Sequence, residues 1–329
     1  MKGVVCTGYG PPEVLQVRSV PDPRPRRNQV CIRLVATSVT ASDCIVRGLK
    51  LRGRYRLFMR LAFGWRAPRR GIIGMIASGR IESVGRDVKA FKEGDEVFGM
   101  DGFRAGTYAE KVCWPATTQL ALRPANISFE EAAALPYGGL LASFFMRRLK
   151  VGAGRRVLIY GASGAIGTSA VQLAKHLGAE VTGVCSTGNV DLVRSLGAAA
   201  VIDYTKEDFT RRGDRYDIIF DAVGKRKSAQ AMANSAAALT SGGVAMSVDD
   251  SFPRTNTSDL LALKQLAESG ELRPVIDRLY PLDDIVEAHR YVDLGHKKGN
   301  VVITVSPSLA DPSYEPMRAE GDPEREYRL

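Results

Sequence analysis

The stretch 156–178, RVLIYGASGAIGTSAVQLAKHLG, constrains the fold of this chain more than any other. Its apolar run VLIY is typical of a strand buried on both faces. Glycines follow at positions 161, 164 and 167, and a helical pattern of apolar residues then continues to Gly178. Such a corner brings backbone N–H groups and the positive end of a helix to one point, which suits a pyrophosphate. The stretch therefore predicts a dinucleotide site, with a purely structural turn as the alternative.

The residues after the next predicted strand, 180–184, indicate which dinucleotide fits. An NAD site usually places Asp or Glu there to bind the adenosine ribose. This chain reads Cys-Ser-Thr-Gly-Asn and has no carboxylate until Asp191, while Arg194 lies one helical turn further on. Hydroxyls and amides can donate to a 2′-phosphate, so we predict NADP(H). Ser186 and Thr187 can in addition cap the following helix.

Length and cysteine usage bound the class of protein. At 329 residues the chain is long enough for two domains. No apolar run is long enough to span a bilayer, and the opening MKGVVCTGYG lacks the apolar region of a signal peptide. The five cysteines are scattered and form no CxxC pair, which indicates neither a disulfide framework nor a thiolate metal site. A cytoplasmic location fits best.

The net charge of +10 is concentrated in the segment 47–70, which has nine basic residues and no acid. Interleaved apolar residues leave three interpretations open: a nucleic-acid surface, a basic amphipathic helix on a membrane, or a solvated lid near an anionic cofactor. The lid is favoured because no nucleic-acid fold signature accompanies the charge. We expect no nucleic-acid partner and at most a weak membrane-surface contact through 47–70.

Two patterns of secondary structure divide the chain. Short β-like runs broken by glycine and proline predict a barrel-like β domain first. From Ser128, which forms a predicted capping box with Glu131, strands alternate with helices and predict a doubly wound parallel sheet. Polar, proline-bearing sequence predicts a disordered tail over 307–329. The helices expected in the second half and at the chain end cover 228–239, 259–269 and 284–294.

Ordered motifs along residues 1–305 resemble a known family: MKGVVCTGYGPPEVLQV, GDEVFG, GTYAEKV, ALRPANISFEEAAALP, GASGAIGTSAVQLAK, VIDYTKEDF, FDAVG and KKGNVVITV. They are similar to the medium-chain dehydrogenase/reductase superfamily, in its zinc-independent quinone-oxidoreductase-like branch. The resemblance implies an α/β protein with its active site in a cleft between two domains. These would be a GroES-like β-barrel domain, residues 1–125 and 271–306, and a Rossmann NADP-binding domain, residues 126–270.

Zinc-using relatives carry a Cys before a near-adjacent Asp and, later, a Gly-His-Glu. The similar positions here read Thr40-Ala41-Ser42-Asp43 and Gly74-Met75-Ile76, and the four-cysteine structural lobe is absent. Thr and Met are not a zinc pair, so we expect no metal site. Without a Lewis acid, alcohol oxidation is disfavoured and reduction of an electron-poor acceptor is easier.

The resemblance thus implies hydride transfer from NADPH to a quinone or an α,β-unsaturated carbonyl compound, a small-molecule substrate. The resulting oxyanion would need only hydrogen-bond donors and a proton from solvent. Two alternatives remain open: a zinc-free dehydrogenase or reductase of another carbonyl or alcohol, and an NADPH-binding protein with little turnover.

The resemblance also implies residue roles. By pocket logic alone, rather than by the resemblance, Thr40 and Tyr137 are candidate donors to the substrate, with packing as the alternative role of Tyr137. Ser186 and Thr187 would bind the 2′-phosphate, and Tyr204 would lie beside the adenosine phosphate. The cofactor would also meet the turn at Val223 and the last strand at Lys298 and Asn300. The pyrophosphate would be held by Gly161, Ser163, Gly164, Ala165, Ile166 and Gly167.

The chain departs from the family in three places. Thr40 replaces a common asparagine, and the usual acid is missing from 74–79, which predicts the loss of a buried hydrogen bond in the β domain. Only ten polar residues, 249–258, follow the fifth predicted strand, and they cannot supply the sixth strand that often pairs across a dimer. We therefore expect a truncated sheet edge and a monomer or an atypical dimer.

Overall fold

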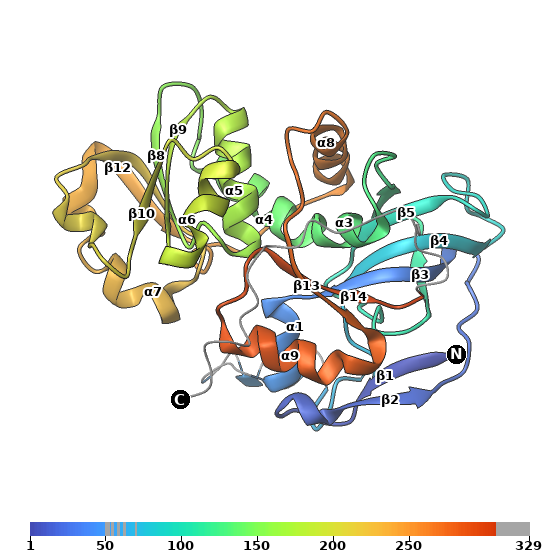
Figure 1. Ribbon diagram of the computed structural model, residues 1–329. Coiled ribbons are helices and arrows are strands. Elements are labelled where there is room, and N and C mark those ends of the chain that lie inside the picture. The colour runs from blue at the N-terminus through green and yellow to red at the C-terminus, as the bar shows by residue number, and fades with distance from the viewer. Residues whose placement is uncertain (50–52, 54–55, 58–59, 62–63, 70, 307–329) are drawn as a thin grey trace.

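The computed structural model describes residues 1–49, 53, 56–57, 60–61, 64–69 and 71–306 (Figure 1). The predicted tail 307–329 lies outside the described residues. So does part of the basic segment 47–70, including Lys50, Arg52, Arg54 and Arg70. None of the described helices combines the length and hydropathy that crossing a membrane requires.

One sheet of seven strands builds the β domain, in the order β13-β14-β3-β4-β5-β7, with β6 paired to β3. Its centre is β3, which is almost entirely buried and pairs antiparallel with β14, β4 and β6. A separate ribbon pairs β1 with β2. The bounds are β1 (Lys2–Cys6), β2 (Leu15–Ser19), β3 (Gln29–Val39), β4 (Ile76–Val84), β5 (Glu96–Met100), β6 (Lys111–Pro115), β7 (Gln119–Leu122), β13 (Ile276–Pro281) and β14 (Asn300–Thr304).

The second sheet is parallel throughout, in the order β10-β9-β8-β11-β12. Consecutive residues of β8 enter different cores: Val157 and Ile159 lie in the core shared with α4 and α5, and Leu158 lies on the opposite face. This alternation confirms a doubly wound sheet. Its strands are β8 (Arg156–Tyr160), β9 (Glu180–Cys185), β10 (Ala200–Asp203), β11 (Tyr216–Asp221) and β12 (Leu239–Ser247).

The predicted loss of a sixth strand is confirmed, because residues 248–256 are all described and contain no strand. The helices are α1 (Ala41–Gly48), α3 (Phe129–Ala134), α4 (Pro136–Arg148), α5 (Ala165–His176), α6 (Val190–Ser195), α7 (Lys225–Met232), α8 (Thr257–Glu268) and α9 (Ile285–Leu294). Short 3₁₀ turns cover 12–14, 187–189, 209–211, 235–238 and 282–284.

One helix prediction is wrong. A single helix over 228–239 was expected, but α7 begins at Lys225 and ends at Met232, before a 3₁₀ turn over 235–238. The early start follows from Gly224, whose φ of +100° lets the chain turn into the helix. The early end coincides with Asn234, since asparagine competes with helical hydrogen bonding and favours turns.

A continuous apolar core joins the two sheets through α3 and α4. Phe98 of β5, Phe145 of α4 and Phe220 of β11 are fully buried in it, and the rings of Phe145 and Phe220 lie 5.1 Å apart. Figure 1 shows β13 and β14 returning to lie beside β3, and α9 lying beside α1. The chain end therefore completes the first sheet, as expected, whereas the domain boundaries at 125/126 and 270/271 stay a prediction.

Candidate active site

The glycine corner after β8 has the geometry that a pyrophosphate requires. Gly161 has a φ of +77°, which permits the tight turn. A Cβ on Gly167 would lie 2.1 Å from the carbonyl oxygen of Gly161, so only glycine lets α5 pack this closely. A Cβ on Gly164 would meet nothing closer than 3.6 Å, which leaves its face open.

The open face coincides with the start of a helix. Gly164 is the N-cap of α5, and its carbonyl accepts the first helical hydrogen bond from Thr168. The N–H groups of Ala165, Ile166 and Gly167 therefore have no partner within the helix. These donors and the helix dipole favour an anion at this place, so the corner fits the pyrophosphate of a dinucleotide.

The last strand reaches the same corner. The N–H of Gly299 donates to the carbonyl of Ser163 over 2.7 Å, and Gly299 pairs with Gly164 in a parallel bridge. Asn300 is buried, and its side-chain amide donates to the carbonyl of Val275 over 3.1 Å. This bond therefore engages the side-chain amide that the family resemblance assigns to cofactor binding.

The two lysines beside Gly299 are placed differently. The backbone N–H of Lys298 donates to Asp277 over 2.9 Å, and its side chain is half-buried. The amine of Lys297 instead donates to the carbonyl of Gly299. Sequence reasoning missed Lys297, although its neighbour Lys298 was expected at the cofactor.

At the end of β9, where the adenosine ribose of a dinucleotide would lie, one side chain connects this strand end with the glycine corner. The amide of Asn189 donates to the hydroxyl oxygens of Ser163, at 3.2 Å, and Ser186, at 3.0 Å. Because the Ser186 oxygen accepts this bond, its own proton remains for another acceptor. The buried Oδ1 of Asn189 has no hydrogen-bond partner among the described residues. Neither Ser186 nor Asn189 caps the following turn through its side chain, so the capping role suggested for Ser186 is not observed.

Thr187 faces a carboxylate that the sequence did not point to. Its hydroxyl donates to Asp203 over 2.6 Å and lies 3.0 Å from that of Thr205. Hydrogen bonds, first from Thr187 and then from Thr205 and Lys206, lower the pKa of Asp203 to about 2. The sequence argument for NADP(H) considered only the residues that directly follow β9. Asp203 instead ends the adjacent strand β10, where it pairs in register with Cys185.

The remaining predicted cofactor contacts lie at the carboxyl ends of the same sheet. Tyr204 is 48% exposed, and its ring centroid lies 6.3 Å from that of Tyr160. Val223 is 38% exposed in the turn after β11. That turn is held by the buried Asp221, which accepts hydrogen bonds from the backbone N–H groups of Val223 and Gly224.

The β domain contributes a buried capping box at the start of α1. The Thr40 hydroxyl donates to Asp43 over 2.6 Å, and the backbone N–H of Thr40 donates to the same oxygen over 2.8 Å. Donation from Thr40 to a substrate would require the first of these bonds to break. Burial raises the pKa of Asp43 to about 6, although hydrogen bonds from Thr40 act in the opposite direction.

A second hydroxyl pair lies across the interface between the two halves. The hydroxyls of Ser42, in the first turn of α1, and Tyr137, in the first turn of α4, are 3.1 Å apart. Burial raises the pKa of Tyr137, so its hydroxyl stays protonated at neutral pH. The sequence analysis did not single out Ser42, although it stands two residues after Thr40, where a helix start presents polar side chains.

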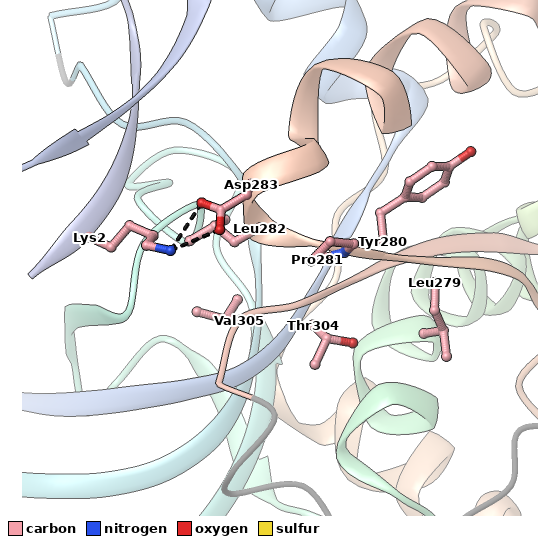
Figure 2. A pocket seen from close by; sticks show the side chains of 8 residues that line it. All are labelled: Lys2, Leu279, Tyr280, Pro281, Leu282, Asp283, Thr304 and Val305. Atoms are coloured by element: carbon pink, nitrogen blue, oxygen red, sulfur yellow. Dashed lines mark hydrogen bonds and ion pairs between the residues drawn. The ribbon is translucent and has the colours of Figure 1, made fainter.

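A hollow of about 460 Å³ lies elsewhere in the molecule (Figure 2). Its lining residues are Lys2, Leu279, Tyr280, Pro281, Leu282, Asp283, Thr304 and Val305. Lys2 and Asp283 form an ion pair of 2.9 Å at one side. β14 starts at the glycine corner and reaches this hollow only at its other end, about 13 Å further along the strand. The hollow is therefore separate from the dinucleotide site.

Comparison with known proteins places this geometry in a family. Residues 26–124 match the alcohol dehydrogenase GroES-like domain, and residues 196–303 match a zinc-binding dehydrogenase domain. The 2-methylene-furan-3-one reductase of Solanum lycopersicum is 33% identical over 92% of this chain and 79% of its own length. The chain belongs to the medium-chain dehydrogenase/reductase superfamily. Its sequence places it in the zinc-independent branch of that superfamily.

Two further members of the superfamily are similar over most of the chain. The chloroplastic NADPH-dependent alkenal/one oxidoreductase of Arabidopsis thaliana is 32% identical over 92% of this chain and 79% of its own length. The quinone oxidoreductase of Coxiella burnetii superposes with a TM-score of 0.79 at 28% identity, covering 93% of this chain and 99% of that one. The predicted fold class, a GroES-like domain with a Rossmann sheet, is confirmed.

At the positions where zinc-using members of the superfamily hold metal, this chain has side chains of another kind. The hydroxyl of Thr40 lies 3.9 Å from the sulfur of Met75, and neither is a usual partner for zinc. No group of three or more His, Cys, Asp or Glu side chains suited to a metal occurs within the described ranges. The hydroxyl of Ser78, buried within the acid-free stretch 74–79, has no hydrogen-bond partner among the described residues.

Proposed function

We propose that this protein is an NADPH-dependent, zinc-free oxidoreductase that reduces a quinone or an α,β-unsaturated carbonyl compound by hydride transfer. The observation that carries the proposal is the glycine corner at Gly161, Gly164 and Gly167, joined to the last strand by the bond from Gly299 to Ser163. The tomato reductase, the Arabidopsis alkenal/one oxidoreductase and the Coxiella quinone oxidoreductase support the same reaction class.

NADP(H) fits the residues present. The N–H groups at the start of α5 would bind the pyrophosphate, and the free hydroxyl proton of Ser186 would bind the 2′-phosphate. Thr187 would act indirectly, because its proton is engaged with Asp203. Tyr204 and Val223 would flank the nucleotide from the neighbouring strand ends. When bound, NADPH supplies the hydride at C4 of its nicotinamide.

The residues of this chain would bind the substrate oxygen and exclude water. Ser42 and Tyr137 would donate hydrogen bonds to the oxyanion that forms as the acceptor is reduced. Thr40, whose hydroxyl is held by Asp43, would orient the start of α1 rather than donate directly. Solvent would deliver the final proton.

The proposal predicts a small-molecule substrate, a protein without a nucleic-acid partner and, from its cysteine usage, a cytoplasmic location. It divides the chain into a catalytic domain, residues 1–125 and 271–306, and a nucleotide-binding domain, residues 126–270. A weak membrane-surface contact through 47–70 stays a prediction. Arg47 is not part of it, because the structure buries this side chain completely.

The test is NADPH oxidation followed at 340 nm against a panel of quinones, enals, enones, saturated ketones and aldehydes. We expect turnover with quinones or enones and little with saturated carbonyls. Turnover restricted to saturated carbonyls would favour a dehydrogenase of another class, and tight NADPH binding without any turnover would contradict an enzyme.

The hydroxyl pair has its own test. Removing one charge-assisted hydrogen bond to a developing oxyanion costs about 10²–10³ in kcat where the donor is well placed. We therefore expect Tyr137→Phe to lower kcat at least tenfold with little change in NADPH affinity. The matched control is Tyr280→Phe, at a residue that lines the separate hollow of Figure 2. Equal activity of the two variants would exclude Tyr137 as a donor.

A further inference from the structure

The glycine corner itself, residues 161–167, contains no lysine or arginine to balance a doubly negative linker. Its donors are backbone N–H groups, and Asn300 is engaged with Val275. A cation near the corner would add a charge-assisted hydrogen bond, which is about twice as strong as a neutral one. The segment 297–300 reaches the corner from outside the parallel sheet, through the hydrogen bond from Gly299 to Ser163.

We infer that Lys297, rather than its neighbour Lys298, is the cation that binds the pyrophosphate of NADP(H) at this corner. The inference rests on the proposed cofactor and adds a residue that the motif does not indicate. The Lys297 amine donates to the carbonyl of Gly299, and the N–H of Gly299 donates to the carbonyl of Ser163. Two consecutive hydrogen bonds thus connect the amine with the backbone that turns into α5.

The backbone at this point is fixed tightly. Gly299 has a φ of +50°, and a Cβ there would lie 2.3 Å from the carbonyl oxygen of Val275. Its bridge to Gly164 fixes the register between the two halves of the molecule. This fixed backbone keeps the Lys297 amine on the carbonyl of Gly299, the residue that bridges to Gly164 at the start of α5. Lys298 is anchored differently, by its backbone N–H on Asp277.

The surroundings of Lys297 leave its charge poorly compensated without a ligand. Asp277 of β13 faces it and favours the charged form, whereas Lys227 of α7 opposes it; Cys44 of α1 also lies nearby. Burial also raises the pKa of Cys44, so this thiol is neutral at physiological pH and supplies no counter-charge. Burial is the largest effect and lowers the pKa of Lys297 to about 8.

A bound anion would reverse this shift, and the sign of the pH dependence follows. Below pH 8 the amine is already charged, so NADPH affinity should be constant. Above pH 8 binding must first take up a proton, so the Kd should rise by up to tenfold per pH unit. The Kd stops rising once the amine no longer contributes to binding. At that point it equals the Kd of a variant without the charge.

The experiment measures NADPH binding by fluorescence titration, independently of turnover. It compares the full-length wild type with Lys297→Met, Lys297→Arg and Lys298→Met from pH 7 to pH 10. We expect Lys297→Met to weaken binding at pH 7 by about ten- to a hundredfold and to show no pH dependence. Lys297→Arg should keep tight binding up to pH 10, because guanidinium stays charged. Lys298→Met should behave as the wild type.

Adenosine 2′-monophosphate, which lacks the pyrophosphate, separates a local effect from a loss of folding. Lys297→Met should bind it as the wild type does, and weakened binding of both ligands would overturn the inference. So would equal NADPH affinity of Lys297→Met and wild type, or a larger loss in Lys298→Met. If wild-type NADPH binding follows the expected pH profile but no quinone or enone is turned over, the proposed function is contradicted and the inference about Lys297 is not.

Discussion

Gly167 lies at the closest approach between α5 and the end of β8. A methyl group there would meet the carbonyl oxygen of Gly161 at 2.1 Å and the backbone of Ala162 at 2.8 Å. Alanine would gain up to about 1 kcal/mol in helix propensity. The overpacking cost of about 1–3 kcal/mol exceeds that gain, because the opposing atoms are backbone and cannot rotate away.

We therefore expect Gly167→Ala to lower the free energy of unfolding by about 1–2 kcal/mol and to weaken NADPH binding. Urea unfolding measures the first and fluorescence titration the second. The matched control is Gly152→Ala, where a Cβ meets nothing within 4 Å. A Gly167→Ala protein as stable as the Gly152→Ala protein would show that α5 can move away from the strand.

Asp43 makes stability depend on pH in the direction opposite to most carboxylates. Its pKa of about 6 in the folded protein exceeds the unfolded value of about 3.9. The folded state therefore binds the proton more tightly, and the ionised form costs stability above pH 6. That cost is about 3 kcal/mol at pH 8 and disappears as the pH falls toward 4.

The Asp43→Asn variant keeps an acceptor for Thr40 but cannot ionise. The difference in unfolding free energy between wild type and this variant should thus change by about 2–3 kcal/mol between pH 8 and pH 4.5. Wild type gains relative to the variant toward acid. Asp191→Asn, at a fully exposed side chain, is the control and should show no such change. A pH-independent difference for Asp43→Asn would mean that the carboxyl is hydrated.

At the residue scale, features that depend only on residues adjacent in the sequence could be predicted. The capping box of Ser128 and Glu131 follows from local chemistry, and the structure confirms it. The bond from Asn300 to Val275 joins residues 25 apart, and that from Thr187 to Asp203 joins residues 16 apart. Such bonds depend on which strands are adjacent, which no local pattern reveals.

At the scale of elements, an ion pair connects α1 with α9. Arg47 was expected in the solvated basic segment, but its side chain is fully buried and pairs with Asp293. Its Nε and Nη1 have no hydrogen-bond partner in the part of the chain that the structure describes. A guanidinium so placed depends strongly on its carboxylate, since removing one partner leaves an uncompensated buried charge.

We expect Asp293→Leu to destabilise the protein by about 3 kcal/mol. The double variant Arg47→Met, Asp293→Leu should lose less than Asp293→Leu alone, because it buries no unpaired charge. Urea unfolding of the wild type, both single variants and the double variant measures the coupling. Additive losses would show that the two side chains act independently.

The elements that sequence patterns missed have identifiable causes. α4 carries Gly138 and Gly139 in its first turn, which read as helix breakers. In the structure they allow close packing: a Cβ on Gly138 would lie 2.2 Å from the carbonyl oxygen of Ala165, and one on Gly139 would strike Leu263. α1 was missed because its capping box of Thr40 and Asp43 stands beside the charged segment. Tertiary packing decides these cases over local propensity.

At the scale of the whole molecule, the missing sixth strand leaves β12 at the edge of the parallel sheet (Figure 1). Val244 is 46% exposed on this edge. The register with β11 shifts between Tyr216 and Ile218, so regular pairing covers only 244–247. Short and irregular edges are the usual protection against pairing with another chain.

We therefore expect a monomer, with a mass close to the 35.7 kDa of the chain in size-exclusion chromatography with light scattering. Val244→Lys, which adds a charge to the open edge, should leave that mass and NADPH binding unchanged. A dimer of wild type that Val244→Lys dissociates would show that β12 pairs across a two-fold axis in spite of its irregular register. A dimer unaffected by the substitution would place the contact on another face. With either dimer, the nucleotide site would still be complete within one chain, because Ser163 and Gly299 of the same chain are hydrogen-bonded to each other.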